Sequence, residues 1–125
     1  MKLLRVGDIG QEFPAVLDKN NKIRSLKNHI GDLNPHNLKI NILHKLKKID
    51  FTTLPEVSSS ERIGSCISNP GKFLGIGLNF SDHAKEQNLP IPNEPIVFSK
   101  TASSIVGPYD DIVIPKNSHK TDWEV

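Results

Sequence analysis

The feature that most constrains the fold is an apolar run at residues 73–78, which contains two glycines and leads straight into a polar stretch at residues 79–87. A short apolar run of this kind favours a buried strand, and glycine within a strand marks the close approach of another segment. The polar stretch is typical of a short helix, with Asn79 or Ser81 capping its first turn. The sequence therefore predicts a buried strand followed at once by a helix that ends near Gln87.

Two side chains on this predicted helix are candidates for chemistry. His83 and Glu86 are three residues apart, so both project from one helical face and can interact. A carboxylate beside an imidazole favours the imidazolium and fixes the tautomer, which suits a general base that activates water. The alternative interpretation is a solvated pair on a surface helix, so the hypothesis depends on the neighbouring motifs.

Several ordered motifs resemble those of the fumarylacetoacetate hydrolase family. Residues 77–83 (GLNFSDH) are similar to its G-x-N-Y-x-D-H segment, with Phe80 in the usual Tyr position. Residues 94–100 (EPIVFSK) are similar to its E-P-x-x-F-x-K strand, and residues 103–108 to the loop that follows. Residues 122–125 (DWEV) resemble the start of its D-W/Y-E-V-E-L strand.

The fold class expected from these patterns is α+β. Residues 1–65 resemble, more loosely, the small N-terminal domain of the two-domain family members, and form a small N-terminal α/β unit with its linker. Residues 66–125 are expected to begin the catalytic domain, as the first strands of a mixed, rolled β-structure of the family type that is truncated here. Short strands are predicted at residues 2–6, 15–17, 22–26, 96–100, 111–114 and 122–125, a turn at 18–21, a helix at 38–50 and a linker at 52–70.

The resemblance also implies a divalent metal. Family members hold Mg²⁺, or Mn²⁺ or Ca²⁺, with the two Glu of an E-x-E strand and a later Asp, an all-oxygen ligand set suited to such ions. Glu124 matches the first Glu, and the second would be residue 126 of a chain that has 125 residues. We therefore expect this chain alone, as the N-terminal part of a longer parent, to bind metal poorly and to be inactive.

For the full-length parent, the resemblance implies a homodimeric hydrolase that cleaves a carbon–carbon bond in a β-diketo or acylpyruvate-type acid. Its partner is a small-molecule 2-oxo or diketo acid. His83 and Glu86 would activate water, while Lys100 and Asn79 would contact substrate. Two alternatives stay open: a decarboxylase, isomerase or lyase of the same superfamily acting on a 2-oxo acid, and a non-catalytic remnant or binding partner.

The composition narrows the class of protein. Sixteen Lys and Arg against 14 Asp and Glu give a net charge of +2, too balanced to indicate a nucleic-acid or membrane partner. Cys66 is the only cysteine, so no intrachain disulfide is possible and a reducing compartment is expected. No apolar run approaches the roughly 20 residues of a transmembrane helix. We expect a cytoplasmic protein, with a mitochondrial address left open for a eukaryotic parent.

Overall fold

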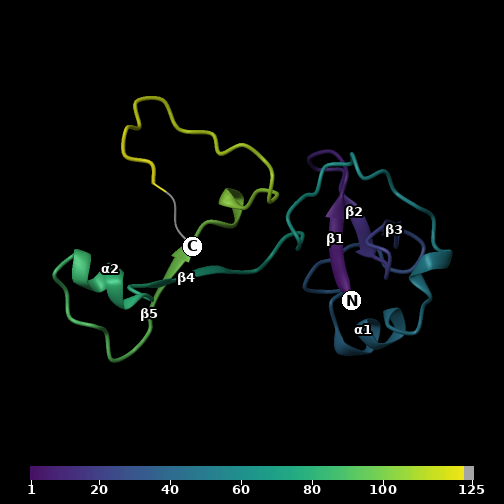
Figure 1. Ribbon diagram of the computed structural model, residues 1–125, viewed down its shortest axis with the longest axis horizontal. Coiled ribbons are helices and arrows are strands. Elements are labelled where there is room, and N and C mark those ends of the chain that lie inside the picture. Colours follow the sequence, from purple (N-terminus) through teal and green to yellow (C-terminus); the bar gives the residue numbers. More distant parts are fainter. Residues whose placement is uncertain (123–125) are drawn as a thin grey trace.

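The N-terminal lobe is built on a three-stranded antiparallel sheet (Figure 1). The computed structural model describes residues 1–122. The strands are hydrogen-bonded in chain order and comprise β1 (Lys2–Val6), β2 (Phe13–Leu17) and β3 (Ile23–Ser25). The register sets Leu4 opposite Ala15 and Val16 opposite Arg24. The predicted bounds of the first strand are confirmed, and the third is one residue shorter at each end than predicted.

β2 begins two residues before its predicted start. Pro14 lies opposite Arg5 of β1, and its carbonyl accepts a hydrogen bond from the backbone N–H of Leu26 at 2.9 Å. Proline has no N–H to give to a sheet, which is why the sequence favoured a start at Ala15. Because the carbonyl of Pro14 is used instead, the strand continues through it.

The predicted turn between β2 and β3 is confirmed, and Asp18 holds it together. Its carboxylate accepts hydrogen bonds from the backbone N–H groups of Asn20 and Lys22, at 2.8 and 3.0 Å, and from Arg24 Nε at 2.8 Å. Asn21 has φ of 58°, a left-handed conformation that asparagine tolerates. Burial raises the pKa of the Asp18 carboxyl, but these hydrogen bonds outweigh it, so the pKa lies below its ordinary value.

The helix α1 (Ile40–Leu46) packs against this sheet. Its last residue, Leu46, is buried in a cluster with Val16 of β2. The helix is shorter than the predicted span of residues 38–50, although Leu38 and Ile49 still pack against the same cluster. At its C-terminal end the backbone bonds tighten, since the N–H of Ile49 donates to the carbonyl three residues earlier. The apolar spacing therefore extends further than the helix.

Residues 52–70, predicted to be a linker, instead cover both edges of the N-terminal sheet. The N–H of Val57 donates to the carbonyl of Ile23 at 2.9 Å, and the N–H of Gly64 donates to the carbonyl of Arg5 at 2.8 Å. The first bond lies at the β3 edge and the second at the β1 edge. Open edges invite pairing with other chains, so this segment closes them.

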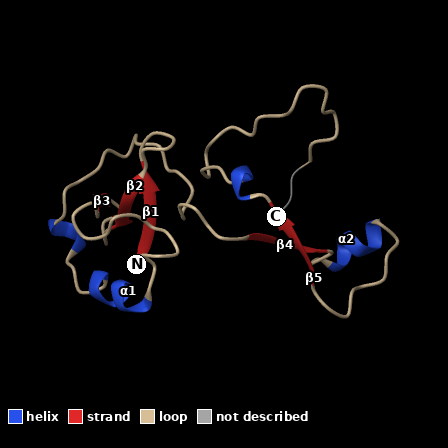
Figure 2. Ribbon diagram, turned by 180° about the vertical axis from the view of Figure 1, so that it is seen from behind, coloured by secondary structure: helices blue, strands red, loops and turns tan. Residues whose placement is uncertain are grey.

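A second lobe contains a two-stranded antiparallel sheet that is separate from the first (Figure 2). Its elements are β4 (Phe73–Gly77), α2 (Ser81–Glu86) and β5 (Ile96–Lys100), in the predicted order. The ring of Phe98 lies so close to Gly75 that a Cβ at this glycine would overlap it. The expected approach was of backbone at the end of the strand, whereas the structure places a side-chain ring over its middle. The bounds of the last of these strands are confirmed.

Burial and capping in the second lobe differ from the prediction. Leu74 and Ile76 of β4 are 53% and 44% exposed, because within residues 1–122 no further layer covers these side chains of the two-stranded sheet. The N-cap of α2 is Phe80, and no side chain makes a capping hydrogen bond there. Neither Asn79 nor Ser81 therefore caps the helix.

The C-terminal segment also departs from the prediction. Residues 111–114 form an exposed loop rather than a strand, since no neighbouring strand pairs with them in the described part of the chain. Of the strand predicted at residues 122–125, only Asp122 is described, and it is not in a strand. The described elements confirm the α+β class, while the rolled β-structure stays a prediction. Among the residues described, no helix is long and apolar enough to cross a membrane.

Replacing the buried leucine of α1 tests where the core lies. Leu46→Ala should lower the free energy of unfolding by about 2–5 kcal/mol, because Leu46 is 2% exposed and its loss leaves a cavity. Ile40→Ala, at the other end of the same helix, is the matched control: Ile40 is 68% exposed, so the change should stay within about 0.5 kcal/mol. Urea unfolding followed by circular dichroism measures both, and equal losses would contradict the assignment.

Candidate functional site

His83 lies on α2 and is half-buried. The neighbouring side chain of Ala84 is fully buried and anchors this short helix. His83 Nε2 lies 2.8 Å from Nε2 of Gln87, one turn further on. This contact suits the tautomer that carries its proton on Nδ1, in which Nε2 accepts a hydrogen bond from the side-chain amide of Gln87. In that tautomer the lone pair needed for proton transfer is at Nε2.

Glu86 is exposed at the end of the same helix. Among the described contacts, His83 is hydrogen-bonded to Gln87 and not to Glu86. The ion pair on this helix joins Lys85 to Asp82 at 3.7 Å, and both side chains are strongly exposed. The structure therefore places His83 and Glu86 on one turn without joining them, and their cooperation stays a prediction.

Asn79 lines a hollow beside the start of α2. The hollow has a volume of about 380 Å³, within the range of small-ligand sites. Leu78 has φ of 48°, so the chain bends between β4 and the helix at this point. The other lining residues come from the end of β4 and from the segments on either side of α2: Ile76, Gly77, Leu78, Ile91, Pro92, Asn93, Glu94 and Pro95.

Lys100 lies at the opposite end of the hairpin from Asn79. The register pairs Lys100 with Phe73 and pairs Ile96 with Gly77, so the last residue of β5 is roughly 13 Å from the end at which Asn79 follows β4. Its ammonium group lies 5.7 Å from the centre of the Phe98 ring. The structure thus does not bring the two predicted substrate-binding residues together.

The predicted metal ligand Glu124 lies outside the described residues. Within residues 1–122, no group of three or more His, Cys, Asp or Glu side chains is placed to hold a metal ion. The described part of the chain therefore does not by itself supply the ligand set that the resemblance implies.

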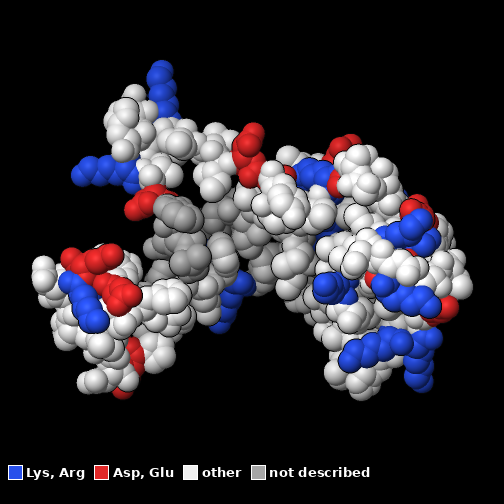
Figure 3. Space-filling view, viewed as in Figure 1, with Lys and Arg blue, Asp and Glu red and all other residues white. Residues whose placement is uncertain are grey.

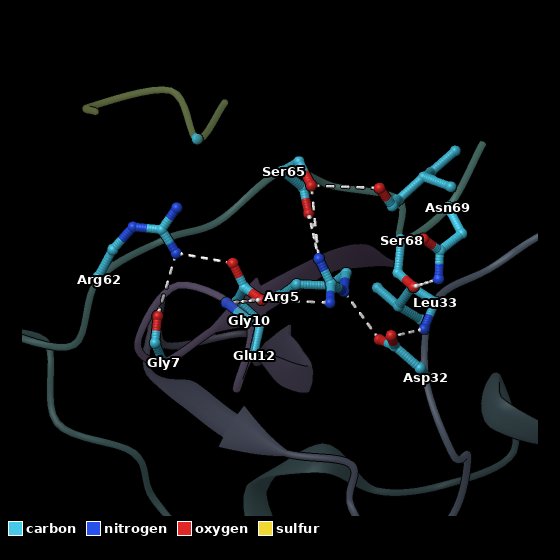
Figure 4. A network of polar contacts seen from close by, with 12 residues as sticks. Arg5, Gly7, Gly10, Glu12, Asp32, Leu33, Arg62, Ser65, Ser68 and Asn69 are labelled. Carbon is cyan, nitrogen blue, oxygen red and sulfur yellow. Dashed lines mark hydrogen bonds and ion pairs between the residues drawn. The ribbon is translucent and has the colours of Figure 1, made fainter. Parts of the chain in front are cut away.

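The largest polar feature of the structure was missed from the sequence (Figure 4). Five charged side chains of alternating sign, here named the charge chain, run from the N-terminal lobe to the loop after β5: Asp32, Arg5, Glu12, Arg62 and Asp110. Arg5 Nε donates to Asp32 at 2.8 Å and Arg5 Nη2 lies 3.5 Å from Glu12. Arg62 donates to the other oxygen of Glu12 at 2.9 Å and to both oxygens of Asp110, at 2.7 and 2.5 Å. The partners of Arg62 are 48 and 50 positions away in the sequence, so no local pattern signals them.

The charge chain keeps its three carboxyls ionised. The guanidinium of Arg62 and the N–H of Gly107 hold the pKa of Asp110 below its ordinary value. Burial raises the pKa of Glu12, but its hydrogen bond with Arg62 and the charge of Arg5 outweigh this, and its pKa is also lowered. Asp32 follows the same pattern: burial is outweighed by hydrogen bonds with Arg5 and Ser68.

A cleft of about 630 Å³ lies against the charge chain. Arg5, Glu12 and Asp32 line one side, and Ser103 and Ile105, from the segment after β5, line the other. Arg5 is only 7% exposed, so its charge is held inside the wall. On the face of the N-terminal lobe in Figure 3, Lys and Arg lie among Asp and Glu, and this face carries no large patch of one sign.

Comparison with known sequences shows that the second lobe is similar to a known family. Residues 72–125 match the family model described as fumarylacetoacetate (FAA) hydrolase C-terminal. This stretch contains β4, α2 and β5, and with them His83, Glu86, Asn79 and Lys100. The resemblance recognised from the sequence motifs is confirmed.

The whole chain also matches longer proteins from Burkholderia. A protein of Burkholderia ambifaria named "Putative hydrolase" is 55% identical over 125 residues, which are 100% of this chain and 44% of that relative. A protein of Burkholderia lata with a name of the same form is 54% identical over the same length and share. The chain therefore spans a little under half the length of these relatives.

The lowered pKa values of the charge chain predict acid lability. A carboxyl group whose pKa is lower in the folded than in the unfolded state stabilises the fold at any pH above its unfolded-state pKa, which is about 4. This stabilisation is lost as the pH falls through the folded-state pKa. The free energy of unfolding should thus change little from pH 7 to 5 and fall below pH 4.

Urea unfolding at several pH values measures this dependence. Asp110→Asn should make the loss shallower but not abolish it, because Glu12 and Asp32 still titrate. A free energy of unfolding that stays constant down to pH 3 would contradict the prediction.

Proposed function

We propose that the chain is part of a hydrolase that cleaves a carbon–carbon bond in a β-diketo or acylpyruvate-type acid, because residues 72–125 match the fumarylacetoacetate hydrolase family model. The names of the Burkholderia relatives support the hydrolase class. The observation that carries the chemistry is the half-buried His83 on α2, whose Nε2 lies 2.8 Å from the side-chain amide of Gln87, its described hydrogen-bond partner.

In this proposal His83 is the general base. Once a water molecule replaces the amide of Gln87, Nε2 of His83 takes a proton from that water. The hydroxide oxygen bonds to a substrate carbonyl carbon, and the bond from this carbon to its neighbour breaks as the carbonyl re-forms. The electron pair passes to the neighbouring carbon, where the adjacent carbonyl delocalises it as an enolate. The proton held by His83 then neutralises the enolate, so protons and electrons balance.

The remaining predicted residues have supporting roles in the same proposal. Glu86, on the same turn, would stabilise the protonated ring by its negative charge after a rotamer change. Asn79 would hydrogen-bond the substrate from the wall of the hollow beside α2. Lys100 is too distant from this hollow to share that role, and would instead contact a second part of the substrate or serve solubility.

The proposal is tested in a chimera in which this chain replaces the matched region of the Burkholderia ambifaria relative. With acylpyruvates or other diketo acids as substrates, His83→Ala should lower kcat by about 10²- to 10⁴-fold, the usual loss for a general base. His44→Ala is the matched control, because this exposed histidine lies on α1 in the other lobe. Unchanged turnover in the His83 variant would remove the base from the mechanism. Release of CO₂ without hydrolysis would instead favour the decarboxylase alternative.

Metal titration of the 125-residue chain tests the expectation that this chain holds only one of the implied metal ligands. Mg²⁺ or Mn²⁺ should show no saturable binding at low micromolar concentration, because Glu124 is the only residue of the chain that matches the implied ligands. Isothermal calorimetry measures this. Stoichiometric binding that disappears in Glu124→Ala would show that other carboxylates of this chain complete the site.

A further inference from the structure

The loop at residues 107–110 is seated on the N-terminal lobe by one arginine. Arg62 presents Nε and Nη2 to the two carboxylate oxygens of Asp110, at 2.7 and 2.5 Å. This bidentate arrangement has two parallel charge-assisted hydrogen bonds, which fixes orientation as well as distance. The pair is partly shielded from water, since the side chains are 24% and 16% exposed. It is thus stronger than an ion pair on an open surface.

The same arginine is fixed to the N-terminal lobe from its other side. Arg62 Nη1 donates to Glu12 at 2.9 Å and to the carbonyl of Gly7 at 3.2 Å, and both residues lie in the connection between β1 and β2. The carbonyl of Arg62 in turn accepts a hydrogen bond from the N–H of Gly7 at 2.9 Å. The guanidinium is therefore held in place before Asp110 reaches it.

The backbone of the loop fits closely against the same segment. Gly107 is buried, and a Cβ added to it would overlap the carbonyl oxygen of Ile63 and lie 3.1 Å from Cα of Gly64. The N–H of Gly107 donates to Asp110 at 2.7 Å, so the carboxylate that binds Arg62 also closes its own turn. A glycine at this position is what allows the loop to lie flat on the N-terminal lobe.

We propose that Arg62 is a clamp that docks the loop at residues 107–110 on the N-terminal lobe, and that this docking builds the cleft of about 630 Å³ between the two lobes. One wall, with Arg5, Glu12 and Asp32, belongs to the N-terminal lobe. The other, with Ser103 and Ile105, precedes the clamped loop by only a few residues and is carried by it. The inference goes beyond the proposed reaction and does not depend on it.

The clamp is tested in the 125-residue chain with a nitroxide attached to its single cysteine. Cys66 is exposed and follows the segment on which Gly107 rests, so the label should broaden the amide signals of residues 106–110 in an NMR spectrum. In Arg62→Ala the paramagnetic relaxation of these amides should fall severalfold, because the loop leaves the lobe. Unchanged relaxation would overturn the proposal.

Two further variants keep the test decisive. Asp110→Asn removes the carboxylate from the loop side and should release the loop in the same way, even if Arg62→Ala disturbs the N-terminal lobe. Lys22→Ala is the matched control: it breaks the ion pair with Glu56 at 2.9 Å, in which both side chains are about half exposed, and should leave the loop in place. Release in the control as well, or in neither clamp variant, would contradict the assignment.

Discussion

The buried guanidinium of Arg5 is the interaction on which the N-terminal lobe depends. An arginine in the wall of a small sheet is costly to desolvate unless its charge is compensated, and removing a partner from a buried pair leaves that cost uncompensated. Asp32 supplies the short contact, and its carboxylate also accepts the N–H of Leu33 at 2.7 Å. Arg5, on strand β1, thereby connects this strand to the loop before the buried Leu33 and to the connection between β1 and β2.

Further side chains continue this pairing of charges away from Arg5, with negative and positive groups alternating. Glu12 stands between Arg5 and Arg62, so neither arginine faces the other without a carboxylate between them. Arg62 then reaches Asp110 in a segment that lies beyond the second sheet. A series of charges that each have an opposite neighbour can cross between lobes without leaving an unpaired ion.

How far the sequence predicts this structure depends on the range of the interactions involved. β1 and β5 have their predicted bounds because each is a short segment rich in residues that favour strands. The turn at Asp18 follows from side chains that bond their own backbone. The start of β2 was missed because Pro14 argues locally against a strand that its neighbours support. Residues 111–114 have strand-like composition but no partner strand in the described structure. The charge chain was invisible because its members are far apart in sequence. His83 was found through a motif, and its role remains a prediction.

The contact between Gly75 and Phe98 has a consequence for how the hairpin is aligned. Moving β5 by one position would set Phe98 opposite Leu74 or Ile76 and turn every side chain of the strand to the other face. In the described part of the chain, no third strand pairs with the hairpin to prevent this. The Phe98 ring fits only over a residue without Cβ. This single glycine therefore favours the register in which Phe98 lies opposite Gly75. It thereby also sets the span that residues 78–95, including α2, must bridge.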